Sequence, residues 1–154
     1  MFRSILMLLI FIVSPIEFSI MKAIDVKVDN NSDLILLTRL INSESHGESK
    51  LDKLLVASVV LNRVHSNEFP NTIRDVIYQR NQFSGINSAL FRFNESNPYD
   101  VESYNAARIV LEYGPVERGI IFFLNPVIST NREWVQTVSK RELAFKSKNH
   151  VFYY

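Results

Sequence analysis

The sequence predicts an α+β fold, with helices over the first two-thirds of the folded region and a small antiparallel β-sheet toward the C-terminus. Two observations lead to this prediction. Before residue 114, apolar residues recur in four segments at intervals of three and four, the spacing of one helix face. After residue 119, short runs of β-branched and aromatic residues alternate with polar turns. Helices followed by strands, rather than alternating with them, are typical of α+β proteins.

The first helix is expected over residues 33–46, where either Ser32 or Asp33 can serve as the N-cap. Gly47 is a natural stop, because glycine readily adopts the left-handed conformation in which many helices end. The last turn of this helix therefore lies where loops are expected to converge.

Glu44 lies on the apolar face of this helix. It follows Leu37, Leu40 and Ile41 at i, i+3, i+4 and i+7 spacing, so one stripe carries three aliphatic side chains and then a carboxyl group. Desolvation disfavours a carboxylate and raises its pKa, which is the condition that a general acid needs near neutral pH. The pattern also fits a partly exposed glutamate at a frayed helix end, and periodicity alone leaves both interpretations open.

A second helix is expected to begin after Ser49 and to run to about His65. Asp52 stands three residues after Ser49, in a capping-box relation. The helix interior is apolar nearly all round, which predicts a buried central helix. Asn62 and Arg63 near its end are expected to be structural, bonding loop carbonyls or pairing with an acid.

Two further helices are expected, over Thr72–Gln79 and from the cap Asp100 to about Tyr113, where Gly114 and a proline close it. Between them, residues 80–98 have no periodic pattern. A loop of this length in a compact domain is usually functional or mobile, so we expect it to form one wall of a cleft.

Three short strands are expected toward the C-terminus. They are Ile120–Leu124, Trp134–Val138 and His150–Tyr154, which are rich in residues that favour strands.

Length and composition restrict the class of protein. The 154 residues, 47% hydrophobic and 21% charged, fit one globular domain over 33–154. The formal net charge is +1 and no dense Lys/Arg cluster occurs, so nucleic-acid binding has no electrostatic support. The chain has no cysteine, which excludes disulfides, thiolate nucleophiles and zinc–thiolate sites.

The N-terminus resembles a secretory signal. Arg3 precedes an uninterrupted apolar run, Ile5–Val13, which is too short to span a bilayer comfortably as a helix. We expect residues 1–23 to be a signal peptide or an uncleaved signal anchor, because Met21-Lys22-Ala23 is an imperfect cleavage site. Residues 24–32 then read as a linker.

The segment around Glu44 allows three chemistries. Glu44 and Glu48 suggest glycoside hydrolysis, in which one acid protonates the leaving oxygen. A metal site would use Glu44, His46 and Glu48 with His65 or His150, but no HExxH-like spacing occurs, so we expect no metal and no cofactor. A Ser/His/Asp hydrolase lacks a GxSxG turn.

Several short segments then match one family, in order along the chain. They are Asn42–Glu48, Ala57–Val64, Phe69–Ile73, Val76–Gln79, Gln82–Ser84, Phe122–Pro126, Trp134 and His150–Tyr153. Together they resemble the SleB-like cell wall hydrolases, the catalytic domain of spore-cortex-lytic enzymes. The resemblance covers about residues 34–154. It implies a lysozyme-like fold, peptidoglycan as substrate and lytic transglycosylase activity.

The resemblance also implies roles for single residues. Glu44 matches the catalytic glutamate of the family's Glu-Ala-Arg-Gly-Glu motif, and Glu48 matches the second acid. Ser45 and His46 replace Ala and Arg in that motif, and neither change touches the acid. The candidate substrate-binding residues are Glu48, Gln82, Phe83, Ser84, Asn125, Trp134 and His150.

Most of these candidates have a structural alternative. Gln82–Ser84 can be an ordinary surface loop with one buried Phe, and Asn125 can stabilise its own turn. Trp134, the only tryptophan, fits a core position slightly better than a sugar-stacking one. His150 can bond substrate or Glu44, or be a satisfied structural histidine.

The leading hypothesis is an exported, monomeric lytic transglycosylase that cuts peptidoglycan glycan strands between N-acetylmuramic acid (MurNAc) and N-acetylglucosamine (GlcNAc). It would act in the periplasm, the cell wall or outside the cell, as a phage lysis protein or a bacterial wall-remodelling enzyme. The alternatives are a hydrolytic muramidase with Glu48 or another acid as partner, an inactive peptidoglycan-binding module, and a scaffold or membrane-anchored interaction protein.

Overall fold

Residues 32–92 and 99–154 are described by a computed structural model of the protein, and they belong to one compact unit. The predicted export signal over 1–23 and residues 24–31 of the predicted linker lie outside the described residues, and Ser32, the last residue of that linker, is the first residue of a helix. Within the two described ranges, no helix is both long enough and apolar enough to cross a membrane.

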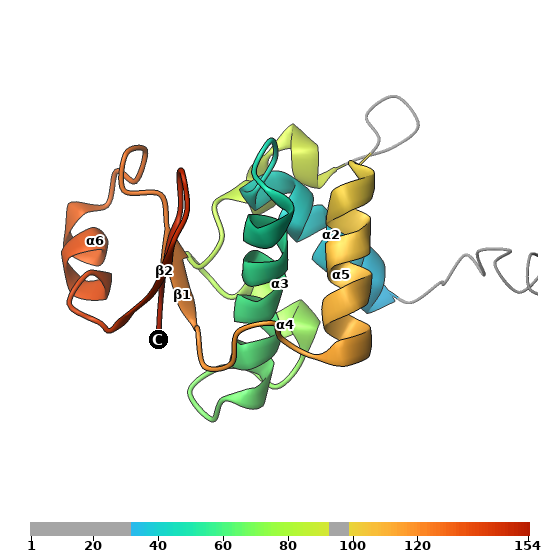
Figure 1. The fold of residues 1–154 in the computed structure, drawn as a ribbon, viewed down its shortest axis with the longest axis horizontal. Coiled ribbons are helices and arrows are strands. Elements are labelled where there is room, and N and C mark those ends of the chain that lie inside the picture. The colour runs from blue at the N-terminus through green and yellow to red at the C-terminus, as the bar shows by residue number, and fades with distance from the viewer. Residues whose placement is uncertain (1–31, 93–98) are drawn as a thin grey trace, which may run out of the picture. The chain divides into compact units, whose positions relative to one another are not determined.

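Three long helices form the body of the helical part, in which α2 and α3 both pack against α5 (Figure 1). Their bounds are Ser32–Glu44 for α2, Lys50–His65 for α3 and Val101–Tyr113 for α5. Two of the expected caps, Ser49 and Asp100, are present, whereas the helix expected over 33–46 already includes Ser32 and ends at Glu44. The Ser49 hydroxyl accepts a hydrogen bond from the Asp52 amide at 3.2 Å, and Asp100 accepts one from the Ser103 amide at 2.7 Å. Caps of this kind contribute about 1 kcal/mol each to stability.

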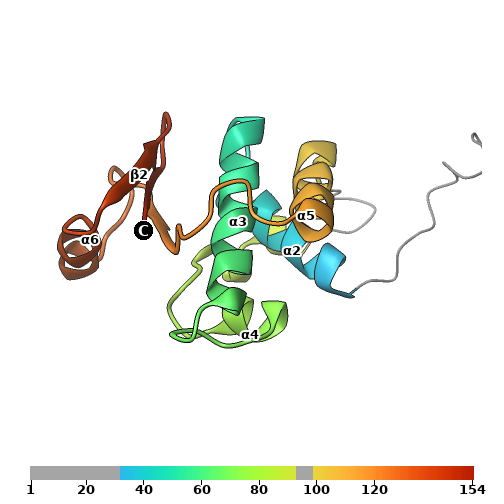
Figure 2. The same cartoon turned by 60° about the horizontal axis from the view of Figure 1, so that its bottom comes forward.

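A short helix and two turns of 3-10 helix pack against α2. Their bounds are Ile73–Tyr78 for α4, Gly85–Asn87 for η1 and Ala89–Phe91 for η2. Figure 2 shows α4 beneath α2 and α3. The predicted loop over 80–98 thus contains regular structure at η1 and η2, while residues 93–98 lie outside the described residues. Ser88 explains part of the difference, because its hydroxyl caps η2 by accepting from the Phe91 amide at 3.3 Å.

The C-terminal part contains a three-stranded antiparallel sheet. Its strands are β1 (Phe122–Leu124), β2 (Leu143–Lys146) and β3 (Val151–Tyr153), in the spatial order β1-β3-β2. β1 occupies the last three residues of one predicted strand, and β3 the middle of another. β2 was not predicted, because its four residues are mostly exposed and its pairing with β3 is irregular between Leu143 and Phe145.

The third predicted strand, Trp134–Val138, was wrong, because these residues belong to helix α6 (Arg132–Val138). The Asn131 side chain caps this helix by accepting from the Trp134 amide at 3.0 Å. Trp134, Val135 and Val138 lie at helical spacing and pack against the sheet in a small core. The cap and this one-sided burial outweigh the strand preference of the individual residues.

Asn62 and Arg63 join the helical part to the C-terminal part. The Asn62 amide donates to the carbonyls of Glu117 and Ile120, and Arg63 Nε donates to the Ile121 carbonyl at 2.7 Å. The Arg63 guanidinium also lies over the ring of Phe69, 4.8 Å from its centroid, and close to two further Phe rings. Burial lowers the pKa of Arg63 to about 10. Both residues therefore bond loop carbonyls, as the sequence predicted.

Candidate active site

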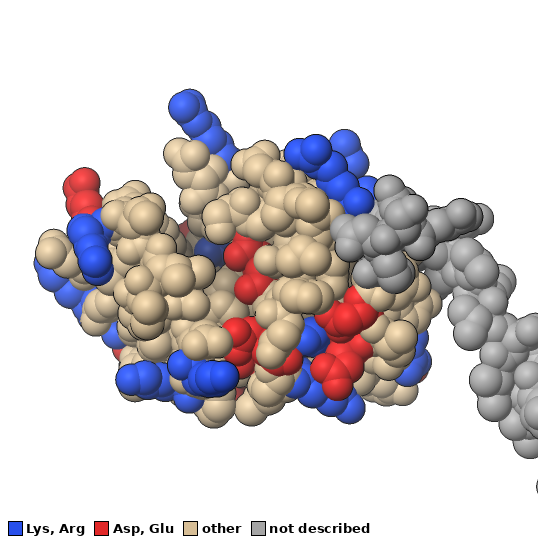
Figure 3. Space-filling view, turned by 90° about the horizontal axis from the view of Figure 1, so that it is seen from above, with Lys and Arg blue, Asp and Glu red and all other residues tan. Residues whose placement is uncertain are grey.

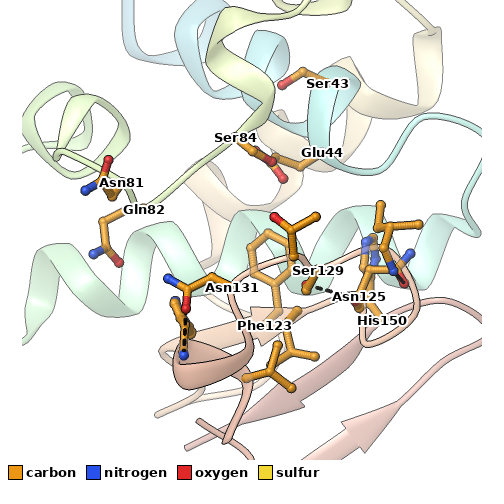
Figure 4. Close-up of a pocket in the computed structure, with 15 residues that line it drawn as sticks. Ser43, Glu44, Asn81, Gln82, Ser84, Phe123, Asn125, Ser129, Asn131 and His150 are labelled. Atoms are coloured by element: carbon orange, nitrogen blue, oxygen red, sulfur yellow. Dashed lines mark hydrogen bonds between the residues drawn. The ribbon is translucent and has the colours of Figure 1, made fainter. Parts of the chain in front are cut away.

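A pocket of about 380 Å³ opens where the C-terminal end of α2 faces the sheet and α6. The surface is hollowed between these two parts, and acidic side chains lie on the helical side of the hollow (Figure 3). In the close-up, Glu44 enters from the end of α2 opposite Phe123 and Ser129 (Figure 4). The pocket is lined by Ser43, Glu44, Asn81, Gln82, Ser84, Phe123, Leu124, Asn125, Ile128, Ser129, Thr130, Asn131, Trp134, Val135 and His150.

Glu44 is the last residue of α2 and its carboxyl group is largely buried. The helix ends there because Gly47, with a φ of 75°, turns the chain away. Glu44 Oε1 accepts a hydrogen bond from the Gly85 amide at 2.6 Å. Burial raises the pKa of Glu44 above its ordinary value, and the Gly85 amide and the nearby positive charge of a protonated His150 oppose this rise. Glu44 therefore keeps its proton at higher pH than an exposed glutamate does.

Gly85 makes this hydrogen bond possible by its lack of a side chain. A Cβ atom at this position would lie 2.5 Å from Ser43 Oγ and 2.8 Å from Glu44 Oε1. Both distances are shorter than real Cβ contacts. The backbone can thus approach the acid closely only with glycine at residue 85.

His150 lines the pocket from the start of β3 and is held from behind by a buried acid. Its Nδ1 lies 3.1 Å from Asp52 Oδ1, and the two side chains are 7% and 1% exposed. Ser147 Oγ donates to the same carboxylate oxygen at 3.0 Å and accepts from the His150 amide at 3.1 Å. Phe123 and Phe152 contact the imidazole edge-on, at centroid distances of 5.5 and 6.1 Å.

Four other predicted residues also line the pocket, namely Gln82, Ser84, Asn125 and Trp134. The Gln82 Oε1 atom is buried and has no hydrogen-bond partner among the described residues. Asn125 Oδ1 accepts from the amides of Val127 and Ile128, so it stabilises its own turn while facing the pocket. Trp134 is half-buried, with its ring edge-on to Phe122 at 5.8 Å, so it is neither a fully buried core residue nor free.

Two predicted residues do not line the pocket. Phe83 is buried in the main core, where its ring packs beside Phe123 at a centroid distance of 6.2 Å. Glu48 Oε1 accepts a hydrogen bond from Asn149 Nδ2 at 2.6 Å. The described residues contain no group of three or more His, Asp or Glu side chains placed to hold a metal ion.

Sequence reasoning missed several pocket residues and the acid behind His150. Ser43, Asn81 and the turn residues 128–130 carry no chemical signature of their own. Asn131 had a detectable signal, because an Asn at the start of an amphipathic segment is a good N-cap. Asp52 was recognised only as a capping residue, since its partner lies 98 residues away.

A second hollow of about 360 Å³ adjoins the pocket and shares Gln82, Asn131 and Trp134 with it. Its other walls include Phe122, on whose ring the Arg141 guanidinium lies at 4.1 Å. Because aromatic faces and planar polar groups line both hollows, the surface offers contacts of the kind that sugar rings use. Together they form an elongated groove past Glu44.

Comparison with known proteins gives consistent results. Residues 47–153 match the family model described as Cell Wall Hydrolase. The spore cortex-lytic enzyme of Bacillus cereus is 29% identical over 127 residues, which are 80% of this chain and 44% of that enzyme. The chain therefore spans less than half the length of this relative.

Two solved structures have the same fold. The catalytic domain of the germination-specific lytic transglycosylase SleB from Bacillus anthracis has a TM-score of 0.66 and 26% identity, over 79% of this chain and 93% of that one. The catalytic domain of the Bacillus cereus SleB protein has a TM-score of 0.62 and 27% identity, over 79% and 89%. They confirm the predicted α+β, lysozyme-like fold class and the predicted resemblance. The match over most of its length shows that this chain belongs to the Cell Wall Hydrolase family of enzymes.

Proposed function

We propose that this protein cleaves the glycosidic bond between MurNAc and GlcNAc in peptidoglycan, as a lytic transglycosylase with Glu44 as its catalytic acid. The observation that carries the proposal is the buried Glu44 carboxyl at the edge of a groove, held by the Gly85 amide at 2.6 Å. The family match begins at residue 47, so the role of Glu44 depends on this geometry. The similarity to SleB supports the choice of substrate.

In the proposed reaction, Glu44 first donates its proton to the glycosidic oxygen as that bond breaks. Its raised pKa keeps the proton on Glu44 to higher pH than on an exposed glutamate, which favours its use as a general acid. The carboxylate that remains then accepts the proton of the muramic C6 hydroxyl, whose oxygen attacks C1 and closes a 1,6-anhydro ring. The attacking group belongs to the substrate, so no water molecule is consumed, and its proximity gives it a large effective concentration.

The carboxylates around the pocket favour this reaction over hydrolysis. A hydrolase of the usual kind needs a second carboxylate facing the sugar. Among the described residues that line the 380 Å³ pocket, Glu44 is the only acid. Glu48 is engaged by Asn149, and Asp52 is buried behind His150. Glu133 lines the adjoining hollow and not this pocket. One acid with an internal nucleophile therefore fits the pocket around Glu44 better than a pair of acids.

The remaining groove residues are proposed to hold the glycan strand. Gln82 and Ser84 offer an amide and a hydroxyl group on the helical side, while Asn131 offers an amide and Trp134 a half-buried aromatic ring on the side of α6. We propose that the protein acts as an exported monomer, where these groups meet peptidoglycan, and that residues 1–23 direct that export.

The test is the mass of the fragments released from purified peptidoglycan. Transglycosylase action gives muramic ends that lack one water, whereas a muramidase gives reducing ends with that water. The Glu44→Gln variant should release neither, while a control at an exposed acid, Glu68→Gln, should act like the wild type. Release of fragments by Glu44→Gln at the wild-type rate would remove Glu44 from the mechanism. Wall binding without any release by the wild type would indicate a binding module.

A further inference from the structure

Asp52 is a buried acid that the proposed reaction does not use. It is 1% exposed and lies on the first turn of α3, on the side of His150 away from the pocket. Its Oδ1 atom accepts a hydrogen bond from Ser147 Oγ at 3.0 Å and lies 3.1 Å from His150 Nδ1. A helix cap alone does not require this burial, because the cap at Thr72 is accompanied by an exposed acid, Asp75, in the same relation. Asp52 therefore has a function besides capping.

The contact with Asp52 determines which atom of His150 remains available. Asp52 accepts, so Nδ1 carries the hydrogen, whether the imidazole is neutral or charged. Nε2 has no hydrogen-bond partner among the described residues, although His150 is only 5% exposed and lines the pocket. Nε2 is not one of the fully buried unpaired side-chain atoms among the described residues, so it keeps some contact with solvent. Because His150 lines the pocket, this ring nitrogen is available to a hydroxyl group of a ligand bound there.

The ring is also restrained against rotation. Phe123 and Phe152 meet the imidazole edge-on, and the His150 amide is bonded to Ser147. The imidazole is therefore fixed by contacts on several sides. A carboxylate partner of this kind orients a histidine and selects its tautomer in many sites.

We propose that Asp52 is a positioning residue, which keeps the hydrogen of His150 on Nδ1 so that Nε2 binds a sugar hydroxyl beside Glu44. The identity of the ligand, a sugar, rests on the proposed function. The tautomer of His150 follows from the contact with Asp52 and does not rest on that function. Nε2 accepts from the hydroxyl when the imidazole is neutral. The Asp52–His150 pair thus supplies a second fixed contact to the sugar that Glu44 protonates.

The first experiment measures the tautomer directly, by long-range ¹H–¹⁵N correlation of the His150 ring over a range of pH. The wild type should show the Nδ1–H form, Asp52→Ala should shift the neutral ring toward the Nε2–H form, and Asp52→Asn should retain much of the wild-type pattern through its amide oxygen. The matched control is Asp75→Ala, which also removes an acid three residues after a helix cap, but one whose carboxylate bonds Thr72 and not His150. An unchanged tautomer in folded Asp52→Ala would overturn the proposal.

The second experiment is a double-mutant cycle with His150→Gln, measured as fragment release from peptidoglycan. Asp52→Ala should lower the rate about 10- to 100-fold, the range for partners that orient metal-bound histidines. It should cause no further loss in the His150→Gln background, because Asp52 acts through His150. Equal losses in both backgrounds would show a merely structural role. If the wild type releases nothing, the proposed function fails while the tautomer result still tests the role of Asp52.

Discussion

The helical part and the C-terminal part of this protein form opposite walls of the same groove, and they differ in how tightly their side chains are packed. Glu44 ends a helix whose apolar residues Leu37, Leu40 and Ile41 are fully buried. Across the groove, the sheet and α6 enclose a core of four buried side chains, and the turn after β1 exposes Val127 and Ile128. The acid thus lies on the well-packed part, and most groups proposed to bind sugar lie on the lightly packed part. Catalytic geometry needs rigidity, whereas a groove wall can adapt to its ligand.

The largest expected effect tests this difference in packing. Leu40→Ala should lower the free energy of unfolding by about 2–5 kcal/mol, because it leaves a cavity in the main core. Val138→Ala should cost roughly 2 kcal/mol, since it removes two methyl groups from the small core. Urea unfolding measures both values. Hydrogen exchange of the wild type should show the sheet amides opening at lower free energy than those of α2 and α3, and equal protection would contradict the comparison.

The next effect concerns the contact that holds the acid. Gly85→Ala places a methyl group where Glu44 Oε1 and Ser43 Oγ now lie, so the carboxyl must move. A displacement of about 1 Å can reduce the rate on the order of 100-fold. Fragment release should fall by that factor, and the melting temperature should fall by a few degrees, because the buried methyl group also crowds Ser43. Gly85→Ser should reduce the rate further, and a wild-type rate in Gly85→Ala would show that the Gly85 contact does not position Glu44.

A smaller effect is expected on the opposite wall. Trp134→Ala removes a half-buried aromatic ring from the groove wall. The KM for glycan fragments should therefore rise several-fold, about 1 kcal/mol in binding, with kcat largely retained. The control is Tyr113→Ala, which removes an aromatic residue that is 75% exposed at the end of α5. A loss of kcat with unchanged KM would place Trp134 in catalysis instead of binding.

The smallest structural change, the isosteric Glu44→Gln, gives a pH-dependent effect. Because the folded pKa of Glu44 is raised above its ordinary value of 4.5, ionisation favours the unfolded chain. The variant should match the wild type in stability below that value and become relatively more stable as the pH rises through the folded pKa. Wild-type activity should decline over the same upper range, as the acid loses its proton. The measurement is the melting temperature of both proteins over a range of pH. If the difference between them does not change with pH, Glu44 is not desolvated.

Local signals allowed much of this molecule to be predicted. The caps Ser49 and Asp100 and the apolar stripe that leads to Glu44 are read within single helices, and the structure bears them out. Trp134–Val138 was wrong because strand propensity was considered and the cap at Asn131 was not. β2 was missed because its pairing with β3, rather than a buried face of its own, defines it.

The arrangement around the acid could not be predicted from local signals. Gly85 meets Glu44 across 41 residues, and His150 meets Asp52 across 98. Neither pairing leaves a pattern in one sequence, since each depends on how η1 and β3 pack. The candidate acid was therefore predictable, whereas the groups that adjust its chemistry were not.

The position of β3 between β1 and β2 has a consequence for how the molecule comes together. Just before β3, Asn149 is hydrogen-bonded to Glu48 and Ser147 to Asp52. The partners are separated by 101 and 95 residues along the chain. Contacts of such long sequence separation carry a high loop-closure cost and form slowly. A partly folded chain can thus form its helices, including α2 with Glu44 at its end, before the sheet and α6 complete the other wall of the groove. We therefore expect the proposed activity to appear only in the last step of folding, when the C-terminal part packs against the helices.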